Sequence, residues 1–194
     1  TPTRMPSPPC CGASAGGVEA LLVLLARLPT ALPATVALVL HRAPHRESRL
    51  ASVLGRCSAL PVVEPEDGDR LMRGTVYVAP RDHHLLIPNH IASLTRGPKE
   101  HRSRPAIDPL FRSAAASYGS RVVGVLLSGL GADGVSGLIA IKARGGMSLV
   151  QSPPQAAFPT LVRHALAEDD VDASLELDAM ADVLALLSAG RGGG

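Results

Sequence analysis

The sequence is poor in aromatic residues and carries little net charge. It contains no Trp, two Phe and two Tyr among 194 residues, although 46% of the residues are hydrophobic. A core must therefore be built from Ala, Val and Leu. Nineteen basic residues balance 17 acidic ones to a net charge of +2, and no basic run with interleaved aromatics is visible. This balance argues against a nucleic-acid-binding protein.

Cysteine is scarce, and long apolar runs are absent. Cys10, Cys11 and Cys57 are an odd number without metal-ligand spacing, which favours a reduced cytoplasmic compartment over a disulfide framework. No apolar run reaches the length that crosses a bilayer, and no secretory signal is evident. We therefore expect a cytoplasmic protein without membrane insertion.

Short apolar runs alternate with helical patterns along the chain, which is typical of an α/β fold. We predict one domain over residues 10–189, a doubly wound, mainly parallel sheet flanked by helices. A flexible Pro-rich lead-in (1–9) precedes it, and a disordered Gly-rich tail (190–194) follows. The predicted strands are 35–40, 75–79, 121–127 and 147–151. The predicted helices are 18–28, 48–57, 105–116, 135–143, 155–167 and 177–188. Residues 84–87 and 91–95 flank Pro88-Asn89 and predict a β-hairpin.

Residues 12–16 read Gly-Ala-Ser-Ala-Gly, a G-x-S-x-G pattern directly ahead of a helical stretch. The small neighbours of Ser14 allow a tight turn that exposes its hydroxyl. Free N–H groups at the start of the helix would favour an oxyanion beside it. Serine is also a preferred helix N-cap, so the pentapeptide alone predicts a capped turn. Catalysis requires partners for Ser14.

Two strand ends supply candidate partners. His41 directly follows strand 35–40, with His45 as a competing base and an exposed loop histidine as the simpler interpretation. Asp133 lies in the glycine-rich stretch after strand 121–127, where it can cap the next helix or orient an imidazole. Parallel sheets place their sites beyond the carboxyl ends of the strands, so Ser14, His41 and Asp133 can meet there.

Other polar groups are weaker candidates for a functional site. The acidic cluster at residues 64–69 lacks a calcium-loop pattern and predicts a solvated turn. Dinucleotide and P-loop fingerprints are absent. The loop 97–104 is expected to be polar and mobile. The remaining histidines are expected in solvated or surface positions: His83, His84, His90, His101 and His164.

Taken together, the chain resembles the catalytic domain of the chemotaxis receptor methylesterase (CheB) family over nearly everything after residue 11. Any one matching block is weak, but their joint order and spacing are specific. The blocks are GASAGGVEAL (12–21), LVLHRAP (38–44), VVEPEDGDRLMRGTVYVAP (62–80), HRSRPAIDPLFRSAA (101–115), VGVLLSGLGADGVSGL (123–138), GGMSLVQ (145–151), AAFPT (156–160) and VDASLELDAMADVL (171–184).

The resemblance implies a Ser-His-Asp triad, with Ser14 as nucleophile, His41 as base and Asp133 as the orienting acid. It also implies an oxyanion hole of backbone N–H groups, which we place at Ala15 and Leu130. The family usually has Met at the Leu130 position, a change that a backbone donor should tolerate.

The activity implied by the resemblance is hydrolysis of γ-glutamyl methyl esters on chemoreceptors, with release of methanol, and in some members glutamine deamidation. No metal or organic cofactor is implied. The implied partners are the methylated cytoplasmic helices of chemoreceptors, with a receptor methyltransferase or a receiver-domain protein as further candidates.

Two features depart from the family pattern. The entry to the serine turn, MPSPPCC, contains three prolines and predicts a short or poorly formed first strand. A phosphorylatable receiver domain is not found ahead of the catalytic blocks, which suggests a stand-alone domain or a fragment. A catalytically inactive relative that binds receptors or signalling proteins is therefore the alternative to an esterase, and a hydrolase of small esters is a third interpretation.

Overall fold

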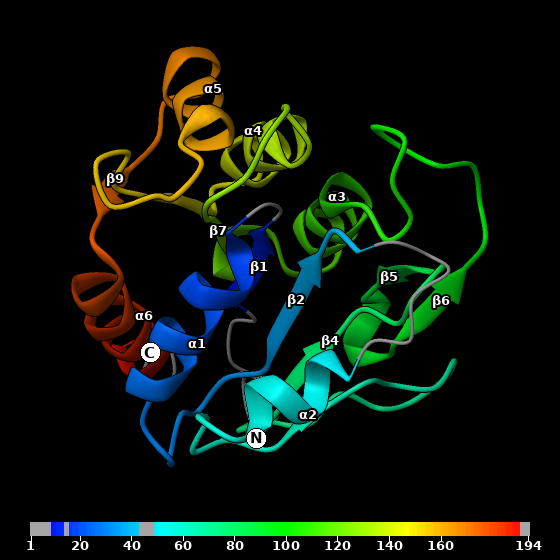
Figure 1. The fold of residues 1–194 in the computed structure, drawn as a ribbon. Coiled ribbons are helices and arrows are strands. Elements are labelled where there is room, and N and C mark those ends of the chain that lie inside the picture. Colours follow the sequence, from blue (N-terminus) through cyan, green and yellow to red (C-terminus); the bar gives the residue numbers. More distant parts are fainter. Residues whose placement is uncertain (1–8, 14–15, 43–48, 191–194) are drawn as a thin grey trace.

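The computed structural model describes residues 9–13, 16–42 and 49–190. Its centre is a seven-stranded parallel sheet with the order β3-β4-β2-β1-β7-β8-β9 (Figure 1). The strands are β1 (Pro9–Ala13), β2 (Val36–Leu40), β3 (Val62–Val63), β4 (Val76–Val78), β7 (Val123–Leu126), β8 (Met147–Gln151) and β9 (Ala173–Leu175). A separate antiparallel hairpin joins β5 (His84–Leu86) to β6 (Ser93–Thr95), as predicted.

Helices cover both faces of the sheet. One hydrophobic cluster includes residues of α1 (Gly17–Arg27), α2 (Leu50–Gly55) and α6 (Leu177–Gly190). The other includes residues of α3 (Ile107–Tyr118), α4 (Val135–Ala143), α5 (Thr160–Glu168) and the hairpin. Alternate residues of β2 enter different clusters, because successive side chains of a strand point to opposite faces. The predicted doubly wound α/β fold is confirmed.

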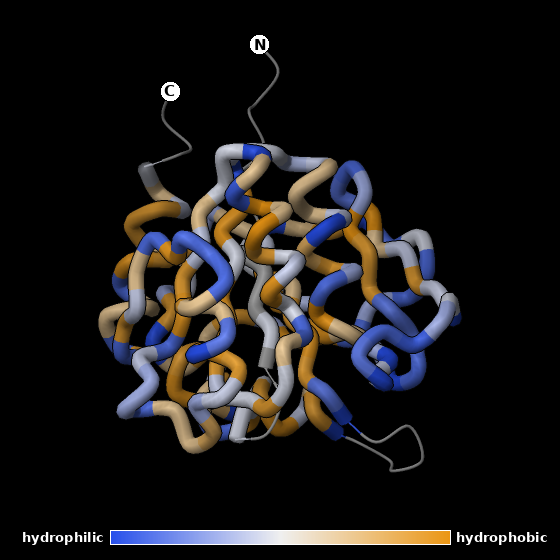
Figure 2. Tube along the Cα trace, turned by 90° about the horizontal axis from the view of Figure 1, so that it is seen from above, coloured by the Kyte–Doolittle hydropathy of each residue, from blue (hydrophilic) through white to orange (hydrophobic). Residues whose placement is uncertain are grey.

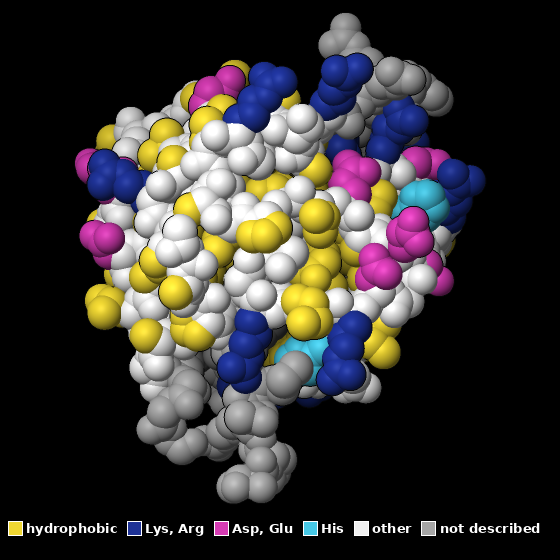
Figure 3. All heavy atoms as spheres, turned by 90° about the horizontal axis from the view of Figure 1, so that it is seen from below, with side chains coloured by type: hydrophobic (Ala, Val, Ile, Leu, Met, Phe, Trp, Pro, Cys, Tyr) yellow, Lys and Arg dark blue, Asp and Glu magenta, His cyan; other side chains and the backbone are white. Residues whose placement is uncertain are grey.

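The core is aliphatic, as the composition predicts. Its largest fully buried side chain is Phe111, and the other large ones are Leu and Ile. Hydrophobic segments concentrate in the interior of the molecule, and hydrophilic segments lie toward its rim (Figure 2). On the face drawn in Figure 3, basic and acidic side chains both occur, and neither sign forms a continuous patch. Within the described ranges, no helix is both long and apolar enough to cross a lipid bilayer.

The strand order creates a switch point at β1. From β1 the chain moves to β2 and β4 on one side of the sheet, and it later returns to β7 on the other side. Helices that follow strands on opposite sides of such a point diverge and leave a crevice beyond the carboxyl ends of the strands. The ends of β1, β2 and β7 are therefore the part of this fold that is shaped for a site.

The expectation of a poorly formed first strand is wrong. Strand β1 begins at Pro9 and pairs with β2 through four residues and with β7 through four residues. A proline at the first position of a strand removes only a donor at its end, so the ladder from Cys10 onward is complete. Pro9 occupies the start of the strand and leaves its carboxyl end unaffected.

Several element boundaries differ from the sequence prediction. The helix predicted at 155–167 begins only at Thr160, because Pro159 cannot donate a bond within a helix and occupies the N-cap position. The helix predicted at 48–57 is limited to α2, with Arg49 at its N-cap; Ser48 lies outside the described residues. Strands β3 and β9 were not predicted, since runs of two and three residues show no measurable alternation.

Candidate active site

His41 and Asp133 meet beyond the carboxyl edge of the sheet. His41 directly follows β2, and Asp133 lies in the loop between β7 and α4. The Nε2 atom of His41 is 2.5 Å from Oδ2 of Asp133. The carboxylate is almost completely buried, whereas the imidazole is 19% exposed and can be reached from solvent. The fold thus joins a buried acid to an accessible base across 92 residues of sequence.

Asp133 is held by the start of a neighbouring helix. Its Oδ2 also accepts the N–H of Ile107 at 2.6 Å, and its Oδ1 accepts the N–H of Asp108 at 3.0 Å. Both donors belong to the first turn of α3, whose N-cap residue supplies no side-chain bond. Asp133 therefore caps α3. The simpler sequence interpretation, in which Asp133 caps the helix that follows it, is wrong because the N-cap of α4 is Gly134.

These contacts set the charge state of Asp133. Burial is the largest influence and by itself would raise the pKa of Asp133. The hydrogen bonds from His41 and from the N–H groups of Ile107 and Asp108 oppose it, and together they hold the pKa of Asp133 below its ordinary value. The carboxylate is therefore ionised at neutral pH and can stabilise a positive imidazole beside it.

A second His–Asp pair lies against the first. Nε2 of His101 is 2.9 Å from Oδ2 of Asp108 and 4.0 Å from Oδ1 of Asp133. Burial raises the pKa of Asp108, and the neighbouring Asp133 raises it further, against the hydrogen bonds from Gly137 and His101. Sequence reasoning missed this pair. An aspartate in the first turn of a helix resembles an ordinary dipole partner, and nothing local indicates that it is buried.

Two loops are joined at the same edge of the sheet. The hydroxyl of Ser128 accepts the N–H of Phe158 at 3.0 Å, and the N–H of Gly129 donates to the carbonyl of Phe158 at 2.9 Å. A Cβ atom at Gly16 would lie 2.8 Å from the Ser128 hydroxyl and 2.9 Å from Cβ of Ala157. Gly16, which precedes α1, therefore packs directly against both loops. Leu130, at the tip of the first loop, is half exposed.

Three residues named from the sequence lie outside the described residues. They are Ser14, Ala15 and the competing base His45. The flanks of the serine turn are described: Gly12 and Ala13 end β1, and Gly16 is the N-cap of α1 with a φ of 71°. Glycine adopts this left-handed conformation without strain, whereas a side chain there would cost about 1–2 kcal/mol.

The expectation that His84 is solvated is wrong. It is buried, its Nδ1 accepts the N–H of Ala106 at 3.2 Å, and its Nε2 therefore carries the proton that it donates to the carbonyl of Pro98 at 2.9 Å. Arg104 adds hydrogen bonds to Asp82 and to the carbonyls of residues 96 and 97. The loop 97–104 is thus attached to the body of the molecule at several points, which places His101 beside Asp108.

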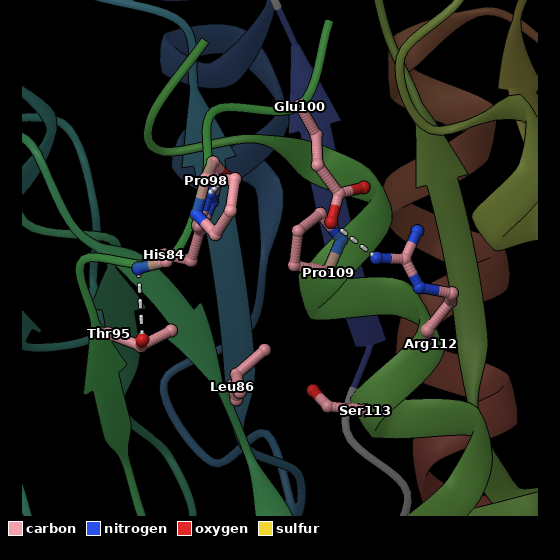
Figure 4. A pocket seen from close by; sticks show the side chains of 9 residues that line it. His84, Leu86, Thr95, Pro98, Glu100, Pro109, Arg112 and Ser113 are labelled. Atoms are coloured by element: carbon pink, nitrogen blue, oxygen red, sulfur yellow. Dashed lines mark hydrogen bonds and ion pairs between the residues drawn. The ribbon is translucent and has the colours of Figure 1, made fainter.

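A pocket of about 390 Å³ lies between the hairpin and α3 (Figure 4). Its charged side chains, Glu100 and Arg112, pair with each other at 2.6 Å. The Ser113 hydroxyl accepts the N–H of Ile87 and donates to the carbonyl of Leu110. His41 and Asp133 do not line it. Because Glu100 and Arg112 pair with each other and the Ser113 hydroxyl already has a donor and an acceptor partner, this pocket carries no constellation suited to acyl transfer.

One group of side chains has the composition of a metal site. Ligand atoms of His101, Asp108 and Asp133 all lie within 4.8 Å of one another. Each carboxylate oxygen in the group already accepts at least one hydrogen bond from an N–H group. A cation would have to displace the backbone donors on Asp133 and on Oδ1 of Asp108, so the described contacts favour hydrogen bonding over metal coordination.

Comparison with known proteins matches residues 10–184 to the CheB methylesterase family. A protein-glutamate methylesterase/protein-glutamine glutaminase 2 of Anaeromyxobacter dehalogenans is 41% identical over 167 residues, which cover 86% of this chain and 49% of that protein. A protein of the same name from Methanosarcina acetivorans is 38% identical over 179 residues, covering 88% and 50% respectively. The chain thus spans about half the length of these relatives.

A solved structure extends the similarity to the fold. The crystal structure of the Thermotoga maritima CheB methylesterase catalytic domain superposes with a TM-score of 0.89 at 30% identity, covering 94% of this chain and 98% of that one. A relative from Leptospira interrogans is 34% identical over 173 residues, covering 89% of this chain and 90% of that protein. By sequence over most of its length and by structure, the chain belongs to the CheB methylesterase family.

Proposed function

We propose that this chain is a protein-glutamate methylesterase that hydrolyses γ-glutamyl methyl esters of chemoreceptors through Ser14, His41 and Asp133. The observation that carries the proposal is the 2.5 Å hydrogen bond between His41 and the buried Asp133. Ala13, which precedes Ser14, pairs in parallel register with Leu40, which precedes His41. The chain therefore leaves two adjacent strands at the same edge of the sheet, immediately before the nucleophile and the base.

In the proposed reaction, His41 accepts the proton of the Ser14 hydroxyl as the oxygen attacks the ester carbonyl. Because Asp133 engages Nε2, the ring nitrogen left for Ser14 is Nδ1. The tetrahedral intermediate collapses as the C–O bond to the methoxy group breaks and the imidazolium returns the proton, which releases methanol. Water, deprotonated by the same imidazole, then attacks the acyl-enzyme and yields the glutamate carboxylate and free Ser14. Asp133 stabilises the imidazolium in both halves of the reaction.

The negative oxygen of the intermediate would be bound by the backbone N–H groups of Ala15 and Leu130. No described residue accepts a hydrogen bond from the N–H of Leu130, which leaves this donor available for substrate. The carbonyls on either side, of Gly129 and Gly131, bond to Leu161 and His164 and fix the peptide planes of the loop. Loss of one such donor typically costs about 10²- to 10³-fold in rate.

The substrate would be a methylated receptor helix in the cytoplasm. The same acyl-enzyme forms from a glutamine side chain when ammonia rather than methanol leaves, so deamidation is the second activity that this arrangement supports. The two relatives named above carry both activities in their names. A receptor methyltransferase or a receiver-domain protein would be a further partner in the same adaptation system.

The decisive experiment incubates the purified chain with methylated receptor and measures methanol. We expect release by the parent chain and a loss of about 10⁴-fold or more in Ser14→Ala, the scale set by removing a triad member. Ser174→Ala, on the exposed face of edge strand β9, is the matched control and should match the parent. Absence of release by the parent with retained receptor binding would identify the inactive binding module instead. Release that persists in Ser14→Ala would refute the assigned nucleophile.

A further inference from the structure

The starts of α3 and α4 cap each other through two aspartates. Asp133, two residues before α4, accepts the N–H groups of Ile107 and Asp108 at the start of α3. Asp108, in the first turn of α3, returns the contact: its Oδ1 accepts the N–H of Gly134 at 3.0 Å and of Gly137 at 2.7 Å. Each helix N-terminus is thus capped by the carboxylate that belongs to the other.

This exchange explains how two buried carboxylates tolerate each other. Asp108 and Asp133 are 2% and 1% exposed, so water does not screen their repulsion. Four backbone N–H groups and the positive ends of two helix dipoles face them instead. His41 on one side and His101 on the other supply the remaining donors.

The geometry around Gly134 links Asp108 to the position of Asp133. Gly134 follows Asp133 and has a φ of 101°, a conformation that residues with side chains rarely adopt. A Cβ atom there would lie 2.6 Å from Cδ2 of Leu126 and 2.8 Å from Cγ2 of Ile107. The bond from the Gly134 N–H to Asp108 therefore fixes the peptide that carries Asp133, in a place where packing permits little else.

We propose that Asp108 is a positioning residue of the active site: by holding the start of α4, it keeps Asp133 aligned with His41. The inference rests on the proposed triad. Asp108 touches neither substrate nor the reacting atoms in this scheme. It acts through Asp133 alone, and its loss should lower kcat while leaving KM unchanged.

Two substitutions separate positioning from charge. Asp108→Ala removes both bonds to α4, whereas Asp108→Asn retains an oxygen that can accept the N–H groups of Gly134 and Gly137 while losing the charge. A misplacement of about 1 Å costs on the order of 10²-fold in rate, which is the loss in kcat expected for Asp108→Ala. Asp108→Asn should recover at least about tenfold of that loss, because alignment rather than charge is restored.

A double-mutant cycle with Asp133→Asn distinguishes positioning through Asp133 from a purely structural role of Asp108. If Asp108 acts through Asp133, Asp108→Ala should have almost no further effect on kcat in the Asp133→Asn background. We take about twofold as no effect, because double-mutant cycles are precise only to about that factor. Asp172→Asn is the matched control, since Asp172 also accepts a backbone N–H, from Ser148, and pairs with Lys142 at the other end of α4. It should leave kcat unchanged. Circular dichroism of each variant establishes that it is folded.

The low-field proton NMR resonance of the His41 N–H bonded to Asp133 gives a measurement that needs no substrate. Its loss in His41→Gln assigns it and separates it from any signal of the His101–Asp108 pair. We expect it in the parent and in Asp108→Asn, and we expect its loss in Asp108→Ala. A folded Asp108→Ala variant that keeps this resonance, or that loses as much kcat beside Asp133→Asn as alone, would overturn the inference. If the parent releases no methanol, the proposed function fails, and the resonance alone then decides whether Asp108 positions Asp133.

Discussion

Replacing Asp133 by Asn tests the site most severely, because the amide cannot satisfy the donors that surround the carboxylate. Three N–H groups, from His41, Ile107 and Asp108, converge on its two oxygens. With the amide oxygen in the Oδ2 position, the NH₂ group faces the N–H of Asp108. With the oxygen in the Oδ1 position, the NH₂ group faces His41 and Ile107 instead.

Either orientation leaves a buried donor facing another donor, which costs about 1–3 kcal/mol of unfolding free energy. The second orientation also donates a hydrogen to Nε2 of His41 and so forces the imidazole proton onto the nitrogen that must act as base. In serine proteases the equivalent change lowers kcat by roughly 10⁴-fold. We expect a loss of that order here, together with a lowered stability.

The assay combines methanol release from methylated receptor with urea unfolding of the same preparations. Asp172→Asn again serves as the control, because its carboxylate is partly exposed and lies away from His41. The reasoning is refuted if Asp133→Asn remains folded and retains more than about a tenth of the parent kcat. Unchanged stability in urea would contradict the three-donor geometry even if activity were lost.

Two further predictions concern the charge of Asp133 and the packing of Gly16. The pKa of Asp133 is lowered in the folded chain, so its ionised form stabilises the fold above about pH 4, and this contribution is lost as pH falls through the lowered pKa. The difference in unfolding free energy between the parent and Asp133→Asn should therefore narrow from pH 7 to pH 3 in urea titrations. A difference that widens would mean that folding raises the pKa of Asp133 rather than lowering it. Gly16→Ala should cost about 1–2 kcal/mol from its positive φ, and about 1–3 kcal/mol more because the new Cβ lies 2.8 Å from the Ser128 hydroxyl. It should also lower kcat at least about tenfold by displacing the serine turn; thermal unfolding and methanol release measure both effects, and parent-like values would contradict the packing.

Much of the fold was accessible from the sequence, because strands and helices have different local periods. The run at residues 35–40 is continuous and apolar, and it becomes β2, which is buried on both faces. The helix predicted at 135–143 and the strand predicted at 147–151 have the same bounds as α4 and β8, since glycines separate them. The strand ends at His41 and before Asp133 could be named for the same reason.

What the sequence by itself determined, then, is the order of elements, the aliphatic core and the strand ends from which the site is built. Only the tertiary structure decided that Asp133 caps α3 rather than its own helix, and that Asp108 caps α4 in return. It also decided that His84 is buried and that β1 pairs on both sides although it begins at a proline. The two exchanged caps depend on which helix N-termini meet at the sheet edge. Local patterns do not encode such meetings, because the hydrogen bonds that define them join residues 25 or more positions apart.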